Sequence, residues 1–482
     1  MKANCSSEFL GTEKISKLLL SFSMPAFIAM LASGIYNIVD TIFVAKGIGT
    51  LAIGGIGIVF PIQTLYAAFA QMISIGAASA ISRSLGEQNN NRANQVMTNA
   101  YILTTIISIL LMITSFFFIN QILYIFGSNE ELIPYARDYL LISIWAIPFN
   151  ALALLSSAVF RSEGNIKISM ITVLIGSLFN IALDLLFIFV LNWGIKGAAL
   201  ATVLAQALAT AFSLFFILSH RSIVKFERKY FIPNLKVSTS IISVGFSAFA
   251  RNGASSLFAL ITNATLRSYG GTVSLTAFGT VNRIISFFFL PIMGINQGLQ
   301  PIASYNYGAK QPDRIKQVVK LALIYTTIIG AIGSIVGILF PSTVINLFTK
   351  DKSLISEATF VLRLQLLFFW TIGLQMVAST FYQSLGKPIP SLFLSILRQF
   401  IILIPLILIL PRYTSLGLNG VWYSFPISDF TAFVISALIL WRAWHHLNKK
   451  SDDNLLSSLF LIVNRPCSSS LFRFFRCVYT FA

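Results

Sequence analysis

The chain has 482 residues, of which 56% are hydrophobic and only 10% are charged, and its formal net charge is +18. The mean hydropathy is +0.81. A soluble protein carries about a quarter charged residues, so this composition excludes an ordinary soluble domain. It therefore also excludes a soluble nucleic-acid-binding protein, which the positive net charge alone would suggest.

Apolar runs of about 20 residues or more recur along the whole chain, and each is long enough to cross a hydrocarbon core of about 30 Å as a helix. The longer runs must tilt, kink or extend beyond the bilayer. We predict twelve transmembrane helices, at residues 17–45, 51–83, 93–120, 134–160, 167–192, 197–219, 237–266, 273–305, 316–345, 356–384, 389–410 and 416–442.

The two halves of the sequence match each other in register. A shift of 222 residues places glycines of the first half on glycines of the second, and one extra residue continues the match near the sixth helix. The pairs are Gly49–Gly271, Gly76–Gly298, Gly86–Gly308, Gly164–Gly386 and, after the insertion, Gly194–Gly417. This pattern indicates a duplication of a six-helix unit, which is the architecture of secondary transporters. The predicted fold class is therefore an all-α integral membrane protein with two pseudo-symmetric six-helix bundles.

The duplication divides the chain into an N-lobe (1–219), a basic linker (220–236), a C-lobe (237–447) and a tail (448–482) to which no role is assigned. Most Lys and Arg residues fall in the predicted inner loops and at both ends, as the positive-inside rule requires for cytoplasmic termini. The linker cluster would face anionic lipid head groups. We therefore expect a multi-pass protein of the inner or plasma membrane.

Carboxylates inside a membrane are costly, at about 2.5–3.5 kcal/mol each on insertion scales, so each needs a reason. Asp40 lies seven residues before the predicted outer end of its helix and Asp184 eight residues before its own. These positions are about 10 and 12 Å deep, and Thr202 lies about 8 Å deep. Asn180 precedes Asp184 by one turn on the same helical face.

These four side chains form a candidate oxygen cage for H+ or Na+, with Asp40 and Asp184 titrating as a coupled pair. In the alternative interpretation, Asp40 is an interfacial residue, and Asp184 pairs with a lysine or caps a helix contact. The second-half counterparts of Asp40, Asn180 and Asp184 lack the acids, so we expect coupling chemistry in the first bundle only. Those counterparts are Thr262, Ile402 and Leu406.

Asp429 is a further acid within a predicted helix, and an ion pair with a nearby arginine is its simplest explanation, ahead of a substrate role. The embedded cations of the second half are Arg251, Arg283, Arg363 and Arg398. Arg283, next to Asn282, is alternatively a residue of the central cavity. The candidate substrate-cavity residues are Tyr36, Asn37, Asn282, Arg283 and Gln297.

Pro25 lies inside the first helix, which also carries Asp40, and it is a candidate hinge because proline removes one backbone hydrogen bond. A static kink is the competing interpretation. The chain has no Gly-x-x-x-x-Gly-Lys-Ser/Thr loop for a nucleotide, and His220, His445 and His446 form no metal or catalytic constellation. We therefore expect no enzyme activity and no cofactor besides the coupling ion.

Several segments resemble the MATE (multidrug and toxic compound extrusion) transporters, closest to their bacterial multidrug-efflux branch. They are the glycine-rich stretches in 55–62, 75–76 and 84–86, the loop RSEGN at 161–165 and the run QPIASYNYGAK at 300–310. The resemblance covers about residues 14–447. It implies two six-helix lobes around a V-shaped cavity, a monomer, and export of amphipathic, often cationic compounds driven by Na+ or H+.

The family's acid in the first helix matches Asp40, its Asn and Asp in the fifth helix match Asn180 and Asp184, and its threonine in the sixth matches Thr202. Some members also carry essential acids in the seventh and tenth helices. Here the only acid in those helices is Glu357, near the start of the tenth, which puts a second-lobe cation site in doubt.

Three functions remain open from the sequence. The first is an antiporter that exports cationic compounds in exchange for H+ or Na+, with membrane lipids and small amphipathic substrates as partners and no nucleic acid. The second is a flippase of lipid-linked oligosaccharide or cell-envelope precursors, whose phosphates would meet Arg251, Arg283 and Arg398. The third, a receptor or scaffold without transport, is disfavoured by the duplicated, acid-bearing bundle. A carboxylate cage suits both ions, so the choice between H+ and Na+ stays open.

Overall fold

The computed structural model describes residues 7–126, 130–219, 221–349 and 351–449. His220 and nearly all of the predicted tail lie outside these residues. Contacts divide the chain into two units, 1–437 and 438–482. In the second unit, the end of the last helix carries a ring contact between Trp441 and His445, with centroids 4.8 Å apart. All other features below belong to the first unit.

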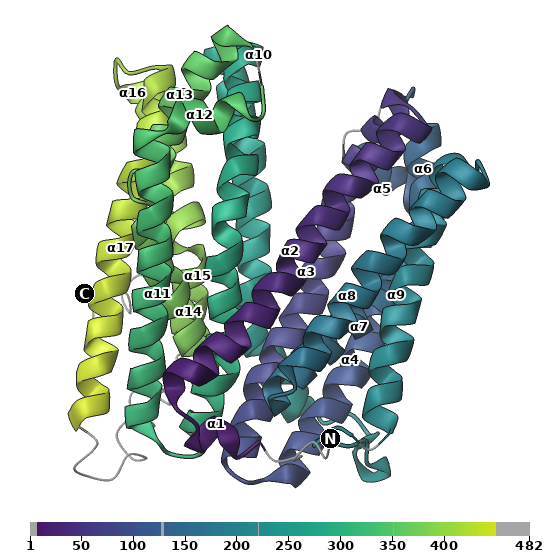
Figure 1. Ribbon diagram of the computed structural model, residues 1–482, viewed down its shortest axis with the longest axis vertical. Helices are drawn as coiled ribbons and strands as arrows, with labels where there is room; N and C mark the ends of the chain where they lie inside the picture. Colours follow the sequence, from purple (N-terminus) through teal and green to yellow (C-terminus); the bar gives the residue numbers. More distant parts are fainter. Residues whose placement is uncertain (1–6, 127–129, 220, 350, 450–482) are drawn as a thin grey trace. The chain divides into compact units, whose positions relative to one another are not determined.

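The first repeat, preceded by the short helix α1, contains the first six predicted spans (Figure 1). Its elements are α1 (Phe9–Thr12), α2 (Ile15–Gly47), α3 (Thr50–Gly86), α4 (Asn90–Phe117), α5 (Ile119–Ile125), α6 (Ile133–Ser143), α7 (Ala146–Glu163), α8 (Ile166–Asp184), a π-helical turn η1 (Leu185–Val190) and α9 (Gly194–Leu218). A 3-10 turn η2 (Arg228–Tyr230) lies in the linker.

The second repeat has the same succession of spans. Its elements are α10 (Leu235–Gly308), α11 (Pro312–Leu339), α12 (Pro341–Asn346), α13 (Lys352–Leu366), α14 (Phe369–Ser384), α15 (Pro388–Ile396), a π-helical turn η3 (Leu397–Leu403), α16 (Ile404–Tyr413) and α17 (Leu418–Lys449). α10 is two helices joined at Gly271, whose φ of 64° and ψ of −155° are not helical. Glycine takes this left-handed φ without steric cost.

The backbone confirms the duplication. Residues with positive φ come in pairs at the same shift as the sequence repeat, with Asn192 alone unmatched in the described part of the chain. The pairs are Gly49–Gly271, Gln88–Lys310, Gly164–Gly386 and Gly194–Gly417. The helix breaks at Phe118 and Phe340 are likewise 222 residues apart. Both copies therefore share turns as well as composition.

Nine described helices are long and apolar enough to cross a membrane, and two bent pairs raise the number to eleven. With α10 counted as two spans, this agrees with the twelve predicted. The predicted fourth and tenth helices are not straight, however: they bend by 53° between α6 and α7 and by 46° between α13 and α14. Pro148 follows the first bend and cannot donate a hydrogen bond to the carbonyl four residues earlier, Ile144, so the helix opens there.

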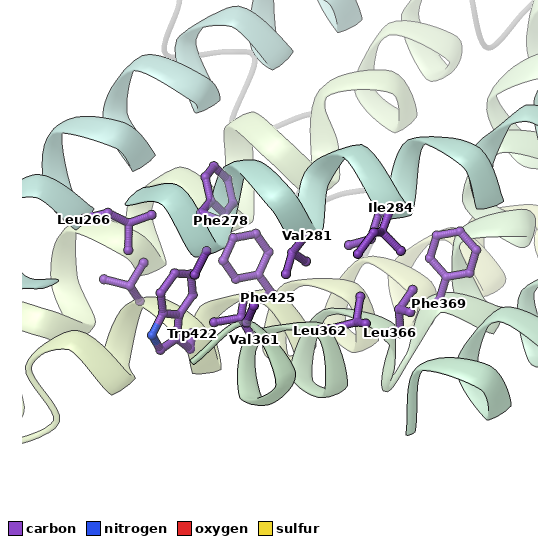
Figure 2. Close-up of a cluster of buried hydrophobic side chains, with 14 of the residues drawn as sticks. Leu266, Phe278, Val281, Ile284, Val361, Leu362, Leu366, Phe369, Trp422 and Phe425 are labelled. Carbon is purple, nitrogen blue, oxygen red and sulfur yellow. The ribbon is translucent and has the colours of Figure 1, made fainter. Parts of the chain in front are cut away.

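Each repeat has its own apolar core, built from corresponding positions. Val59 and Ile62 in the first repeat correspond to Val281 and Ile284 in the second, and all are buried. Larger rings fill the second core. Figure 2 shows Phe278, Phe425 and Trp422 gathered there, with ring centroids 6.0–6.4 Å apart. The second core includes Leu266, Phe278, Val281, Ile284, Val361, Leu362, Leu366, Phe369, Trp422 and Phe425.

The two repeats contact each other through glycines near the end of the bundle that carries α1, here called the α1 end (α1 and the turns at Gly86, Gly164, Gly308 and Gly386). A Cβ on Gly76 would lie 2.0 Å from the carbonyl oxygen of Ile241, and one on Gly86 would lie 2.0 Å from that of Tyr305. Ser79 Oγ also donates to the carbonyl of Gln383 at 2.6 Å. Only residues without a side chain allow such close helix packing.

The same contacts fade with distance from the α1 end. The outermost hydrogen bonds between the repeats join Asn252 to Gln71 at 3.3 Å and Gln297 to the sulfur of Met30 at 3.2 Å. In the part of the chain that the structure describes, no hydrogen bond links the repeats in the half of the helices that contains Asp40. The two repeats are thus sealed together at one end of the membrane span only.

Candidate cation-coupling site

The structure brings Asp40 of α2 and Asp184 of α8 together inside the first repeat. Their carboxyl groups lie against each other, close enough to share one hydrogen. Asp40 is half-buried and Asp184 fully buried. Gly47, at the end of α2, permits this approach, because a Cβ there would lie 2.3 Å from the side chain of Ile188 in η1. Phe43 and Phe189 reinforce the contact edge to face at 5.5 Å.

Hydrogen-bond donors are missing where these acids meet. Neither carboxylate oxygen of Asp184 has a donor partner when the group is ionised, and the side-chain oxygen of Asn180 has none either. The Asn180 amide donates to Thr202 Oγ1 at 3.3 Å, and Thr202 donates to the carbonyl of Ala198 at 3.2 Å. A buried polar atom without a partner is costly. The site therefore consists of acceptor oxygens that a proton or a hard cation would satisfy.

The helix of Asp184 changes its winding at this site. α8 ends at Asp184 and continues as the π-helical turn η1. Single π-helical turns within α-helices occur frequently at functional sites. Here the turn begins directly after the acid, so it sets the direction from which Asp184 meets Asp40.

Two tyrosines border the acids. Tyr36, predicted as a cavity residue, lies one turn below Asp40, within electrostatic reach of both carboxyls. Tyr139 of α6 was not predicted; it is 3% exposed, and its hydroxyl interacts with the side chains of Thr202 and Gln63. Tyr139 lies six residues into α6, about 9 Å deep, so the depth criterion that selected Asp40 would also have selected it.

The other predicted cavity residues do not form one group. Asn37 lies on the exposed face of α2 and donates to the carbonyl of Ser33 at 2.7 Å. Arg283 is exposed on α10, whereas its neighbour Asn282 borders a cavity inside the second repeat. Gln297 lies 15 residues further along α10, about 22 Å away, and contacts α2 through Met30.

Asp429 forms the expected ion pair, and its partner is Arg398. The Nε atom of Arg398 donates to Oδ1 of Asp429, whose side chain is 1% exposed. Glu357, the acid near the start of the tenth span, accepts a hydrogen bond from Ser274 Oγ. The second repeat thus holds its acids in local polar contacts rather than as a pair of carboxylates.

The linker is anchored by a buried carboxylate that we predicted from the sequence to lie in a loop. Glu163, the last residue of α7, accepts hydrogen bonds from Ser222 Oγ and from the backbone N–H groups of Ile223 and Val224, the latter two at 3.2 Å. Asn94 adds a second attachment, because its side-chain oxygen accepts from the N–H of Lys225 at 2.9 Å. The start of the linker is therefore fixed to the first repeat.

Two six-helix repeats of membrane-spanning helices, with two carboxyl groups brought together inside one of them, define a membrane transport protein. The MatE family model matches residues 25–186 and 248–409, one segment in each repeat. The chain belongs to the MatE family.

Known relatives agree over nearly the full length. The multidrug export protein MepA of Staphylococcus haemolyticus is 26% identical over 439 residues, which cover 91% of this chain and 96% of that protein. A crystal structure of MATE in complex with MaD3S superposes with a TM-score of 0.87 at 25% identity, covering 93% of this chain and 100% of that one. A structure described as "protein A" is 38% identical, with a TM-score of 0.84 and coverage of 91% and 98%.

Proposed function

We propose that this protein is a multidrug efflux antiporter that expels amphipathic, cationic compounds in exchange for H+ or Na+. One observation carries the proposal: the buried carboxyls of Asp40 and Asp184 meet where the protein supplies no hydrogen-bond donor to Asp184. Two adjacent carboxylates repel each other, so the site gains most from a bound cation. The relatives named as multidrug export proteins support the substrate class.

Exchange follows if the loaded and empty forms of the site prefer different positions of α2. A cation between the carboxyls draws α2 and α8 together, and an empty pair pushes them apart. The two charges at about 4 Å and an effective dielectric constant of 20 repel by ~4 kcal/mol, which is large enough to shift a two-state equilibrium. An organic cation that approaches Asp40 from its half-exposed side competes for the same negative charge.

Pro25 is placed to transmit such a movement. The α1-end part of α2 is held against α10, where a Cβ on Gly298 would lie 2.8 Å from Ser23 Oγ. The distal part of α2 carries Asp40 and packs against α8. Pro25 cannot bond to the carbonyl of Ser21, so α2 bends there at less cost than elsewhere. We propose Pro25 as the hinge between the two parts.

Reconstituted protein tests the antiport. Proteoliposomes loaded with a fluorescent organic cation are given a pH gradient or a sodium gradient separately, and dye movement against its own gradient is recorded. We expect one of the two gradients to drive it. If neither gradient moves the dye faster than in protein-free liposomes, the antiport mechanism is wrong.

The flippase remains a second candidate because of one polar face. Thr272, Thr276, Gly279 and Arg283 follow one exposed stripe of α10, and lipid tails do not favour such residues. A water-filled space beside this stripe could accept phosphate groups at Arg283. A cell that lacks the protein would then show an envelope defect, whereas sensitivity to organic cations without an envelope defect supports the antiporter.

A further inference from the structure

The second repeat encloses a cavity of about 120 Å³ between α10, α13, α14, η3 and α17. Four aromatic side chains form its apolar wall: Phe258, Phe289, Phe369 and Phe425. Its polar border is made of Asn282, Ser286, Gln365, Arg398 and Gln399. Ser286 lies on the exposed face of α10, so the cavity reaches the surface there. A space of this size holds several waters or an aromatic ring.

Three residues that line this cavity match residues beside the cation-coupling site of the first repeat. Phe258 corresponds to Tyr36 after the shift of 222 residues, and Ile285, another wall residue, corresponds to Gln63. Phe425 corresponds to Thr202 after the shift of 223 that follows the insertion. The cavity therefore lies beside the positions that match the border of the acid pair, with different residues around it.

The charged side chains of the two places differ, because the second repeat has the ion pair of Arg398 and Asp429 and the first repeat has two acids. The counterparts of Asp40 and Asp184 are Thr262 and Leu406, and Arg398 stands where the first repeat has Gly176. The π-helical turn η3 includes Arg398, and η1 begins at Leu185, directly after Asp184. Each repeat thus places a charged side chain in or beside a π-helical turn of its fifth span: Asp184 in the first repeat and Arg398, paired with Asp429, in the second.

Among the described residues, Arg398 and Gln365 have hydrogen-bond donors without an acceptor at this cavity, whereas Oδ2 of Asp429, beside Arg398, is a buried acceptor without a donor. Arg398 uses Nε for Asp429, and no described residue accepts a hydrogen bond from its two terminal nitrogens. Gln365 is 5% exposed, and its buried side-chain nitrogen has no acceptor. The oxygen of Gln399, by contrast, already accepts from Ser255 Oγ at 2.8 Å. A ligand that brings a carboxylate or carbonyl oxygen would satisfy Arg398 and Gln365 together.

We propose that this cavity is a second substrate subsite, which binds a single aromatic ring that carries a carboxylate or ketone oxygen. The phenylalanines stack against the ring, and Arg398 and Gln365 donate to the oxygen. The ion pair with Asp429 holds the guanidinium in place without using its terminal nitrogens. The inference deepens the proposed function, on which it rests, because it assigns exported molecules an acceptor-bearing aromatic end.

Equilibrium binding tests the subsite without any ion gradient. The probes are 4-(dimethylamino)benzoate and N,N-dimethylaniline, which share the ring and differ in the carboxylate, and binding to protein in nanodiscs is followed by fluorescence. The double variant Arg398→Gln/Asp429→Asn replaces the ion pair with a neutral pair of similar shape. Gln365→Leu removes one donor and leaves the ion pair intact.

We expect the double variant to weaken benzoate binding about ten- to hundredfold, the usual effect of losing a hydrogen bond to a charged group. We expect Gln365→Leu to weaken it severalfold, and both variants to bind dimethylaniline, which has no oxygen acceptor, within twofold of the wild type, which also reports an intact fold. The subsite is wrong if the benzoate does not bind the wild type, if neither variant changes its binding, or if benzoate and aniline weaken in parallel. Failure of the antiport would appear separately, as absence of gradient-driven transport with benzoate binding unchanged.

Discussion

Gly245→Ala should force the two repeats apart at a point where their backbones are in close contact. A Cβ on Gly245 would lie 1.7 Å from the carbonyl oxygen of Met72 in α3. The two helices must move apart by about 1.3 Å before this contact reaches 3.0 Å, the limit that real contacts respect. Forced overpacking of this kind costs about 1–3 kcal/mol. We therefore expect Gly245→Ala to lower the free energy of unfolding by that amount.

Gly253→Ala is the matched control on the same helix. Nothing lies within 4 Å of a Cβ at Gly253, and its φ is not positive. Alanine favours a helix over glycine by about 1 kcal/mol, so this variant should be as stable as the wild type or more so. Thermal unfolding of purified protein in detergent measures both. Equal melting temperatures for the two variants, or a stabilised Gly245→Ala, would refute the close packing of α3 and α10.

Three further predictions concern the acid pair, the linker and the orientation. Asp184→Asn should abolish gradient-driven efflux in proteoliposomes. The control Asp138→Asn alters an exposed acid 3.3 Å from Lys196 and should leave efflux near the wild-type rate. An equal loss of efflux in both variants would count against a role for the Asp40–Asp184 pair. Hydrogen bonds from Lys229 and, to a smaller extent, from Asn94 lower the pKa of Glu227 below its usual value of 4.5. The ionised Glu227 therefore stabilises the linker at pH values above 4.5, and this stabilisation is lost as the pH falls through the lowered pKa. Amide-exchange protection of 223–234 should drop over that acidic range in the wild type and stay constant in Glu227→Gln, and a flat wild-type profile would contradict the contact. The protein's three cysteines all lie near the ends of the chain, so a membrane-impermeant thiol reagent should label broken cells and not intact ones if both termini are cytoplasmic; labelling of intact cells would reverse the orientation. These three cysteines are Cys5, Cys467 and Cys477.

Much of the fold could be predicted because glycines mark positions where the backbone takes a conformation that other residues rarely adopt. Gly164 and Gly386 match in the sequence, and both adopt a positive φ that only glycine takes readily. The bends at 144–145 and 367–368 could not be predicted in the same way, because the local sequences there are as apolar as any span. Pro148 was a weak signal for the first bend, and the second bend has no proline after it.

At the candidate site, depth within the span was the productive criterion. It selected Asp40, Asp184 and Thr202, which do gather in one place, and Tyr139 would have met it as well. Gln63 would not, because it lies 13 residues into α3, about 20 Å deep by rise alone, and reaches the site through tilt and the length of the Tyr139 side chain. The cavity of the second repeat could not be predicted from the sequence. Arg398 was identified as a cation within a predicted helix, but the space beside it depends on three-dimensional packing.

The central claim is that Asp40 and Asp184 jointly hold one cation that the organic substrate displaces. Isothermal titration of purified protein with an organic cation, in two buffers of different ionisation enthalpy and with or without sodium, counts the protons or sodium ions released on binding. The account predicts about one cation released per substrate bound by the wild type and none by Asp184→Asn. Substrate binding with no cation released by the wild type, or with the same release by the variant, would contradict it.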